Sequence, residues 1–112
     1  MVKLDFQGKI LLGLFELADD GKVLYSSIES PEGGLQRHPN VDGANFFTDV
    51  AYFSNVDELR RKFELFRLNG ARSTSFQFTC QYSQGPQPIR IVIARLTADS
   101  EPPSILVHFR KP

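Results

Sequence analysis

The residue types that most often carry chemistry are scarce in this chain, which has one cysteine and two histidines. A single cysteine excludes an internal disulfide and a cysteine-based zinc site. His38 and His108 lie far apart in the sequence and have no metal-ligand spacing. We therefore expect a reducing, cytoplasmic setting and no metal site. His38 is expected in a solvated loop, and His108 on an exposed sheet face or in an interface.

Cys80 stands on the apolar side of an alternating segment, where a cysteine usually behaves as a small buried hydrophobe. The functional alternative is a thiol that faces a cavity and binds a ligand or senses oxidation. No catalytic pattern accompanies it: the sequence has no glycine-rich phosphate loop and no strand-to-helix Ser-His-Asp arrangement. The carboxylate pair Asp19-Asp20 precedes Gly21, which indicates a turn. We expect no enzyme and no catalytic residues.

The chain has the size of one domain, with 112 residues, 41% of them hydrophobic, and a formal net charge of zero. This balance argues against a nucleic-acid-binding protein, whose affinity comes mainly from Lys and Arg on phosphates. The apolar run 10–15 is too short for a signal peptide or a membrane span. We expect a single domain over 1–112, with an N-terminal segment 1–9 before a core 10–112.

The zero net charge hides an asymmetry between the two halves of the chain. Residues 1–58 carry ten acidic and four basic side chains, whereas residues 59–112 carry three acidic and nine basic ones. Two halves of opposite sign can simply attract each other within one fold. Alternatively, they form surfaces that steer self-association or a partner. Internal compensation is the simpler interpretation.

The pattern of apolar residues predicts strands at both ends of the chain. Segments 10–17 and 22–27, joined by Asp19-Asp20-Gly21, are typical of a hairpin. Segment 28–40 is rich in Pro and Gly, so only short helical turns are expected there. The period-2 alternation over 75–82 predicts a half-buried strand, segment 83–87 a turn, and segments 89–95 and 104–109 two more strands.

One helix is clear between these strands. The apolar residues at 56, 59, 63 and 66 share one helical face. Asn55 followed by Glu58 indicates a capping box, and Gly70 ends the helix after Asn69. Strands at both ends with helices between them predict an α+β domain with five antiparallel strands, whose short helices and one longer helix lie on one face.

This order is similar to that of PAS domains, and several segments resemble the photoactive yellow protein-like branch. They are Gly21–Leu24, the Gly-x-Asn-Phe-Phe-x-Asp-Val-Ala motif of 43–51, Lys62-Phe63, the strand 76–82 and the ending 107–111. The likeness extends over most of the chain from Ile10 onward. It implies a PAS fold and a sensory or signalling role.

The resemblance also implies which residues correspond to the chemistry of that branch. Its members bind p-coumaric acid as a thioester to a cysteine, and the matching residue here is Phe53, which has no nucleophile. Ser26 and Ser30 match the Tyr and Glu that hold the chromophore's phenolate, and Gln36 matches the gating Arg. Cys80 matches a Phe of the family. A covalent chromophore is therefore not expected, and the cofactor is left open.

The phenylalanines suggest either a ligand cage or a filled core. Six of them would surround the cavity of a PAS fold, at positions 46, 47, 53, 63, 76 and 78. The candidate pocket residues are Ser26, Ser30, Gln36, Phe46, Phe53, Phe63, Phe78 and Cys80. A filled or reduced pocket is favoured, because Phe53 occupies the chromophore's attachment point.

Two functions follow as hypotheses. The first is a non-enzymatic sensory domain that binds a small ligand noncovalently, or that has lost its ligand, and that is not a working p-coumarate photoreceptor. The second is a ligand-free interaction module that forms a homodimer or docks on another signalling protein. Apolar residues on the other side of the sheet, such as Val92 and Ala94, support the second. Neither hypothesis involves nucleic acid or a membrane.

Overall fold

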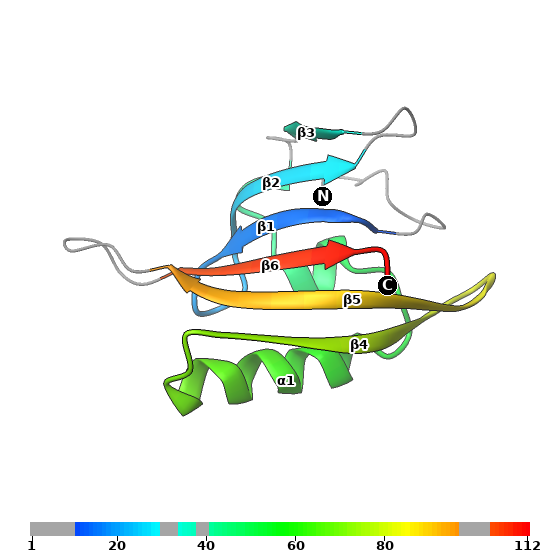
Figure 1. The fold of residues 1–112 in the computed structure, drawn as a ribbon. Helices are drawn as coiled ribbons and strands as arrows, with labels where there is room; N and C mark the ends of the chain where they lie inside the picture. Colours follow the sequence, from blue (N-terminus) through cyan, green and yellow to red (C-terminus); the bar gives the residue numbers. More distant parts are fainter. Residues whose placement is uncertain (1–10, 30–33, 38–40, 97–103) are drawn as a thin grey trace.

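Six antiparallel strands form one sheet in the computed structural model, which describes residues 11–29, 34–37, 41–96 and 104–112 (Figure 1). The strands are β1 (Gly13–Leu17), β2 (Val23–Glu29), β3 (Leu35–Arg37), β4 (Ser73–Tyr82), β5 (Gly85–Leu96) and β6 (Ser104–Arg110). Their order is β3-β2-β1-β6-β5-β4, so the first and last strands of the chain pair at the centre. The N-terminal hairpin and the C-terminal strands therefore share one sheet.

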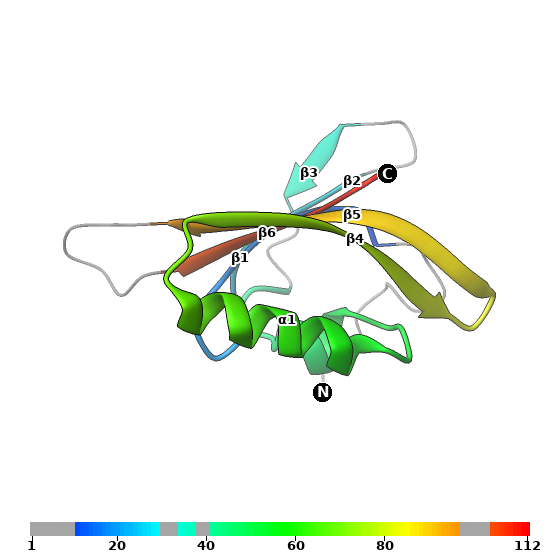
Figure 2. The same cartoon turned by 60° about the horizontal axis from the view of Figure 1, so that its bottom comes forward.

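Within the described residues, a π-helical turn and an α-helix lie on the same face of this sheet, as the sequence predicted for an α+β domain (Figure 2). One is the single π-helical turn η2 (Phe46–Val50), and the other is α1 (Val56–Asn69). The core lies between them and the inward side chains of the strands, and Phe15, Ile91 and Phe109 are almost fully buried there. Within the described residues, no helix is long and apolar enough to cross a membrane.

The prediction of five strands was wrong by one, because β3 forms where only helical turns were expected. β3 pairs with the end of β2 through Ser27↔Arg37 and Glu29↔Leu35. Arg37 anchors it: its guanidinium lies 4.3 Å from the centre of the Tyr25 ring and 2.6 Å from an Asp42 carboxylate oxygen. Residues 35–37 are all exposed, so no alternation in the sequence indicates this strand.

The predicted turn 83–87 is shorter in the structure, since β5 already begins at Gly85 and includes Pro86 and Pro88. The backbone groups of Cys80 and Tyr82 face β5, opposite Gln87 and Gly85. Pro86 and Pro88 alternate with Gly85 and Gln87 along β5, so the backbone nitrogens of the two prolines point away from β4, toward the side of β6. β6 pairs with β5 only as far as Arg90. The missing N–H of each proline therefore removes no ladder hydrogen bond.

The predicted helix is confirmed from Val56 to Asn69, with Gly70 at its end in the left-handed conformation (φ 74°). The predicted capping box does not form. The Asn55 side chain makes no hydrogen bond to the helix and instead bonds to the backbone of β4, at Thr79 and Gln81. The same residue thus ends the preceding loop and attaches α1 to the sheet.

The other end of α1 is held by Arg95, which lies on β5. Its guanidinium donates to the Phe66 carbonyl oxygen at 2.8 Å and to the Ala71 carbonyl oxygen at 3.2 Å. It also lies 5.0 Å from the centre of the Phe66 ring. Carbonyls at a helix C-terminus lack partners within the helix and attract a cation, so this side chain stabilises the last turn.

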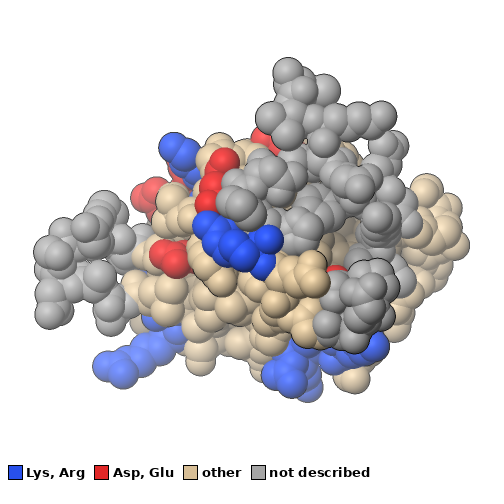
Figure 3. Space-filling view, turned by 90° about the horizontal axis from the view of Figure 1, so that it is seen from above, with Lys and Arg blue, Asp and Glu red and all other residues tan. Residues whose placement is uncertain are grey.

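Side chains of both charges lie on the surface of this fold. On the β3 side of the molecule, acidic and basic side chains are interspersed (Figure 3). A hydrogen bond to Glu64 raises the pKa of Arg67 on α1, and Asp19, in the turn between β1 and β2, raises it to a smaller extent. The ion pairs of the described residues, Arg37–Asp42 and Arg67–Glu64, each lie within one half of the chain, so compensation between the halves stays a prediction.

Candidate functional site

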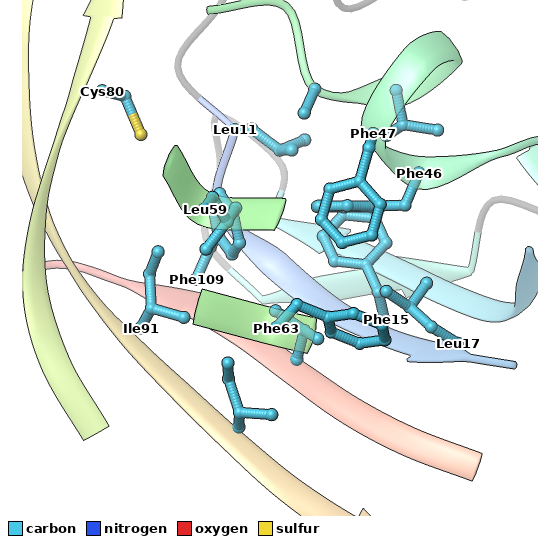
Figure 4. Close-up of a cluster of buried hydrophobic side chains, with 14 of the residues drawn as sticks. Leu11, Phe15, Leu17, Phe46, Phe47, Leu59, Phe63, Cys80, Ile91 and Phe109 are labelled. Atoms are coloured by element: carbon cyan, nitrogen blue, oxygen red, sulfur yellow. The ribbon is translucent and has the colours of Figure 1, made fainter. Parts of the chain in front are cut away.

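A series of aromatic rings runs through the core and joins four of the eight candidate pocket residues, of which Phe46 and Phe63 are labelled in Figure 4. Phe63 of α1 contacts Phe47 at 5.1 Å between ring centres, and Phe47 contacts Phe46 at 5.3 Å. Phe109 on β6 then connects Phe46, at 5.6 Å, to Phe53, at 6.4 Å. The Phe53 ring in turn contacts the Phe78 ring, at 6.1 Å between ring centres. These rings pack on one another between the helices and the sheet, so they fill this space with side chains.

The Gly-x-Asn-Phe-Phe motif positions two of these rings. The Asn45 side-chain oxygen accepts from the N–H groups of Phe47 and Thr48, and its amide donates to the Asp20 carbonyl. A Cβ on Gly21 would lie 3.0 Å from the Phe47 ring, and Gly21 has a positive φ of 90°. The motif therefore fixes η2 against the β1–β2 turn and directs Phe46 and Phe47 inward, which is a structural role.

The polar candidates Ser26 and Gln36 lie in different environments. Ser26 is fully buried on β2, where it is opposite Phe15 of β1. Gln36 is exposed on the edge strand β3 and pairs with Ile28. Ser30 lies outside the described residues, as does His38. The three positions matched to the chromophore's polar partners therefore include one buried and one exposed side chain, with the third undescribed.

Cys80 is the chain's single cysteine, and it points into the core from β4 (Figure 4). Burial raises the pKa of its thiol to about 12, and a hydrogen bond with Tyr82 offsets part of that effect. Burial likewise raises the pKa of the Tyr82 hydroxyl to about 12. At neutral pH both groups are uncharged, and a neutral thiol is neither a good nucleophile nor a metal ligand.

Tyr82 is a site residue that the sequence reasoning did not single out. Its hydroxyl accepts a hydrogen bond from the backbone N–H of Leu11 at 2.9 Å. Its ring contacts Phe53 at 5.7 Å. The only signal in the sequence was its place on the inward side of the alternating strand, which predicted burial but no partner.

A surface depression of about 490 Å³ borders Phe53 and Tyr82. It lies between η2, the loop before α1 and the end of β4, and ten residues line it: Phe47, Thr48, Ala51, Tyr52, Phe53, Ser54, Val56, Gln81, Tyr82 and Ser83. None of these side chains carries a charge at neutral pH. Rings and small hydroxyl or amide groups together suit a small neutral molecule.

His108 is a half-buried titratable residue on the side of the sheet away from the helices. Burial lowers its pKa from the usual 6.5, and the nearby Arg110 lowers it further. Within the described residues, no three His, Cys, Asp or Glu side chains gather where they could hold a metal ion.

Comparison with known proteins places this arrangement in a family, although no protein-family model matches the chain. The chain is 31% identical over 93 residues to the photoactive yellow protein of Halochromatium salexigens, and the match covers 81% of this chain and 73% of that protein. The solved photoactive yellow protein domain of the sensor histidine kinase Ppr from Rhodospirillum centenum has the same fold, with a TM-score of 0.61 at 19% identity, over 99% of this chain and 94% of that one. The chain thus has the PAS fold of that domain and belongs to the photoactive yellow protein family.

Proposed function

We propose that this chain is a sensory domain that binds a small neutral molecule noncovalently, and that it is not a p-coumarate photoreceptor. The observation that carries the proposal is the state of its single cysteine. Cys80 is fully buried, with a thiol pKa of about 12. Thioester formation needs an accessible thiol that can ionise. The same property supports a non-enzymatic role, since this thiol is a poor nucleophile.

Phe53 supports the same proposal. It is the residue that the resemblance matches to the chromophore's attachment point, and its ring is buried against Phe78, Tyr82 and Phe109. A ligand would therefore bind beside this ring, in the depression of about 490 Å³, and not in the space that the ring fills. The absence of charged side chains in the lining favours a neutral aromatic molecule over an anion.

Native mass spectrometry of the purified chain, combined with its absorption spectrum, tests this proposal. We expect a co-purifying small molecule and no absorption band of a covalently bound chromophore. Thr48→Trp should release the molecule, because Thr48 is an exposed residue of the lining and an indole ring would fill the depression. Thr74→Trp, on an exposed part of β4, is the matched control and should retain it. A chromophore band, or release by both variants alike, would contradict the proposal.

The second candidate is a ligand-free interaction module, and one observation favours it. On the sheet face opposite the helices, Leu14 and Val92 flank His108, and Leu106 lies next to Ala94. These five side chains are half-buried, and four of them are apolar, whereas Glu16 lies opposite Leu106 and Arg90 opposite Arg110 on the same face. A homodimer or a signalling partner would cover this face.

The two candidates are distinguished by mass and ligand content. A dimer mass without a ligand, converted to a monomer by Val92→Lys, supports the interaction module. A strict monomer at high concentration that carries a ligand supports the sensor. Circular dichroism of Val92→Lys controls for loss of the fold.

A further inference from the structure

β4 is an edge strand of the sheet, and its outward backbone groups are only partly covered. The Arg72 carbonyl accepts a hydrogen bond from the backbone N–H of Arg95 on β5. Because the backbone groups of successive residues alternate between the two sides of a strand, those of the even-numbered β4 residues bond to β5, and those of the odd-numbered residues face outward. In agreement, the outward groups of Thr79 and Gln81 bond to Asn55 and Ser54. The loop before α1 thus covers the last part of this edge.

The first part of the same edge is open. Ser73, Ser75 and Gln77 are exposed, and within the described residues their outward N–H and C=O groups have no partner. Segment 73–77 contains no proline and no charged side chain. Natural edge strands are usually protected by such residues or by a covering segment, and an unprotected edge is a template for one more strand.

Three basic side chains lie near this open edge. Lys62 of α1 lies beneath it, with its ammonium 5.0 Å from the centre of the half-buried Phe76 ring. Arg72 is exposed immediately before the strand, and Arg90 of β5 pairs with Gln77 across the ladder. Of the acidic residues on α1, Glu64 is paired with Arg67 at 2.9 Å, whereas Asp57 and Glu58 are exposed in the first turn.

We propose that segment 73–77 of β4 binds an extended acidic segment of another protein, which adds a strand to this edge of the sheet. The outward backbone groups of Ser73, Ser75 and Gln77 supply the hydrogen bonds, and the three basic side chains select acidic partners. A second copy of this chain is disfavoured as the partner. A two-fold axis through Ser75 would pair Ser73 with Gln77 of the other copy, and it would bring the two Lys62 side chains, which lie beside Phe76, to the same joined edge.

The test uses a capped, fluorescently labelled peptide that alternates glutamate and valine, and a counterpart with lysine in place of glutamate. We expect the acidic peptide to bind more tightly, and its binding to weaken with added salt. In NMR spectra, hydrogen exchange should slow at the amides of Ser73, Ser75 and Gln77. Lys62→Gln should weaken binding several-fold, whereas Lys22→Gln, on the β1–β2 turn, should leave it unchanged.

Ser75→Pro separates backbone pairing from contacts of the side chain. The backbone N–H of Ser75 faces outward, so a proline at this position is compatible with the pairing of β4 and β5. It removes one hydrogen-bond donor for the added strand and obstructs its approach. We expect at least a tenfold loss of affinity in Ser75→Pro and no loss in Ser75→Ala, with thermal unfolding confirming that both variants fold. Equal binding by Ser75→Pro, equal binding of the lysine peptide, or a homodimer that Ser75→Pro dissociates would each overturn the proposal.

Discussion

Replacing Phe53 with alanine tests whether this ring fills the core beside the depression. Its side chain is 4% exposed and contacts three other aromatic rings, those of Phe78, Tyr82 and Phe109. Removal of a buried phenylalanine costs roughly 3–5 kcal/mol. Because Phe53 also borders an open depression, water can enter part of the vacated space, and we expect a loss of about 3 kcal/mol, at the lower end of that range.

Urea denaturation measures this loss. The chain has no tryptophan, so tyrosine fluorescence and far-ultraviolet circular dichroism serve as the two probes. With a slope of about 1.5–2 kcal/mol per molar urea for a small domain, the midpoint should fall by roughly 1.5–2 M. Domains of this size are stable by about 5–15 kcal/mol, so the variant should still fold.

Tyr52→Ala is the matched control, because Tyr52 is the adjacent aromatic residue in the same lining but is 38% exposed. Its loss should stay below about 1 kcal/mol. The reasoning is refuted if Phe53→Ala costs less than about 1 kcal/mol, or if the two alanine variants lose the same stability. In either case the ring would contribute no more than an exposed residue does, and the depression would not be bounded by a packed core.

Three further predictions concern Arg95, Cys80 and His108. Arg95→Ala should cost about 2 kcal/mol in urea denaturation, because charge-assisted hydrogen bonds to the end of α1 are lost, whereas a similar cost for Arg90→Ala would argue against this role. At about pH 8 the Cys80 thiol of the folded chain should react with an aromatic disulfide reagent at least about a hundredfold more slowly than in denaturant, since burial raises its pKa to about 12; equal rates would show an accessible thiol. His108 has a folded-state pKa below 6.5, so the unfolded chain takes up its proton first; stability should fall as the pH drops below about 6.5, and a His108→Gln variant that falls equally would assign the effect to other groups.

The helix and most strands could be predicted because their signals are local. The spacing of apolar residues in α1 and the glycine after it lie within the element that they define. The role of Asn55 could not be predicted in the same way. An asparagine before a helix can cap that helix or bond to another element, and the partner of the Asn55 side chain, Thr79, lies 24 residues away. The hydrogen bond to Thr79 forms only once β4 is placed beside the start of α1 in the folded chain.

β3 shows the same limit for a whole strand. Three exposed residues between Gly34 and His38 carry no apolar alternation. In the structure the strand pairs with β2, and Arg37 contacts both the Tyr25 ring and the Asp42 carboxylate. The β-strand propensity of three residues is a weak predictor of such a short strand, because strand formation depends strongly on the surrounding contacts.

For the candidate site, the sequence predicted which residues are buried but not how they meet. The inward positions of Phe63, Phe78 and Cys80 follow from the periods of a helix and a strand. The contact that connects these residues does not follow from such periods, because Phe53 lies in a loop and packs against Phe109 of β6. The Tyr82 hydroxyl is satisfied by Leu11, 71 residues away, which no local pattern indicates.

Several residues of the motif that carries the family resemblance have structural roles in this fold. Asn45 and Gly21 hold η2 against the first hairpin, and this contact places Phe46 and Phe47 in the core. Gln36, matched to a gating residue, is instead exposed on a short edge strand. A substitution there alters no buried contact, whereas loss of the Asn45 side chain would leave backbone groups at the start of η2 without their partners. The motif that carries the resemblance is therefore explained by the packing of η2 against the first hairpin.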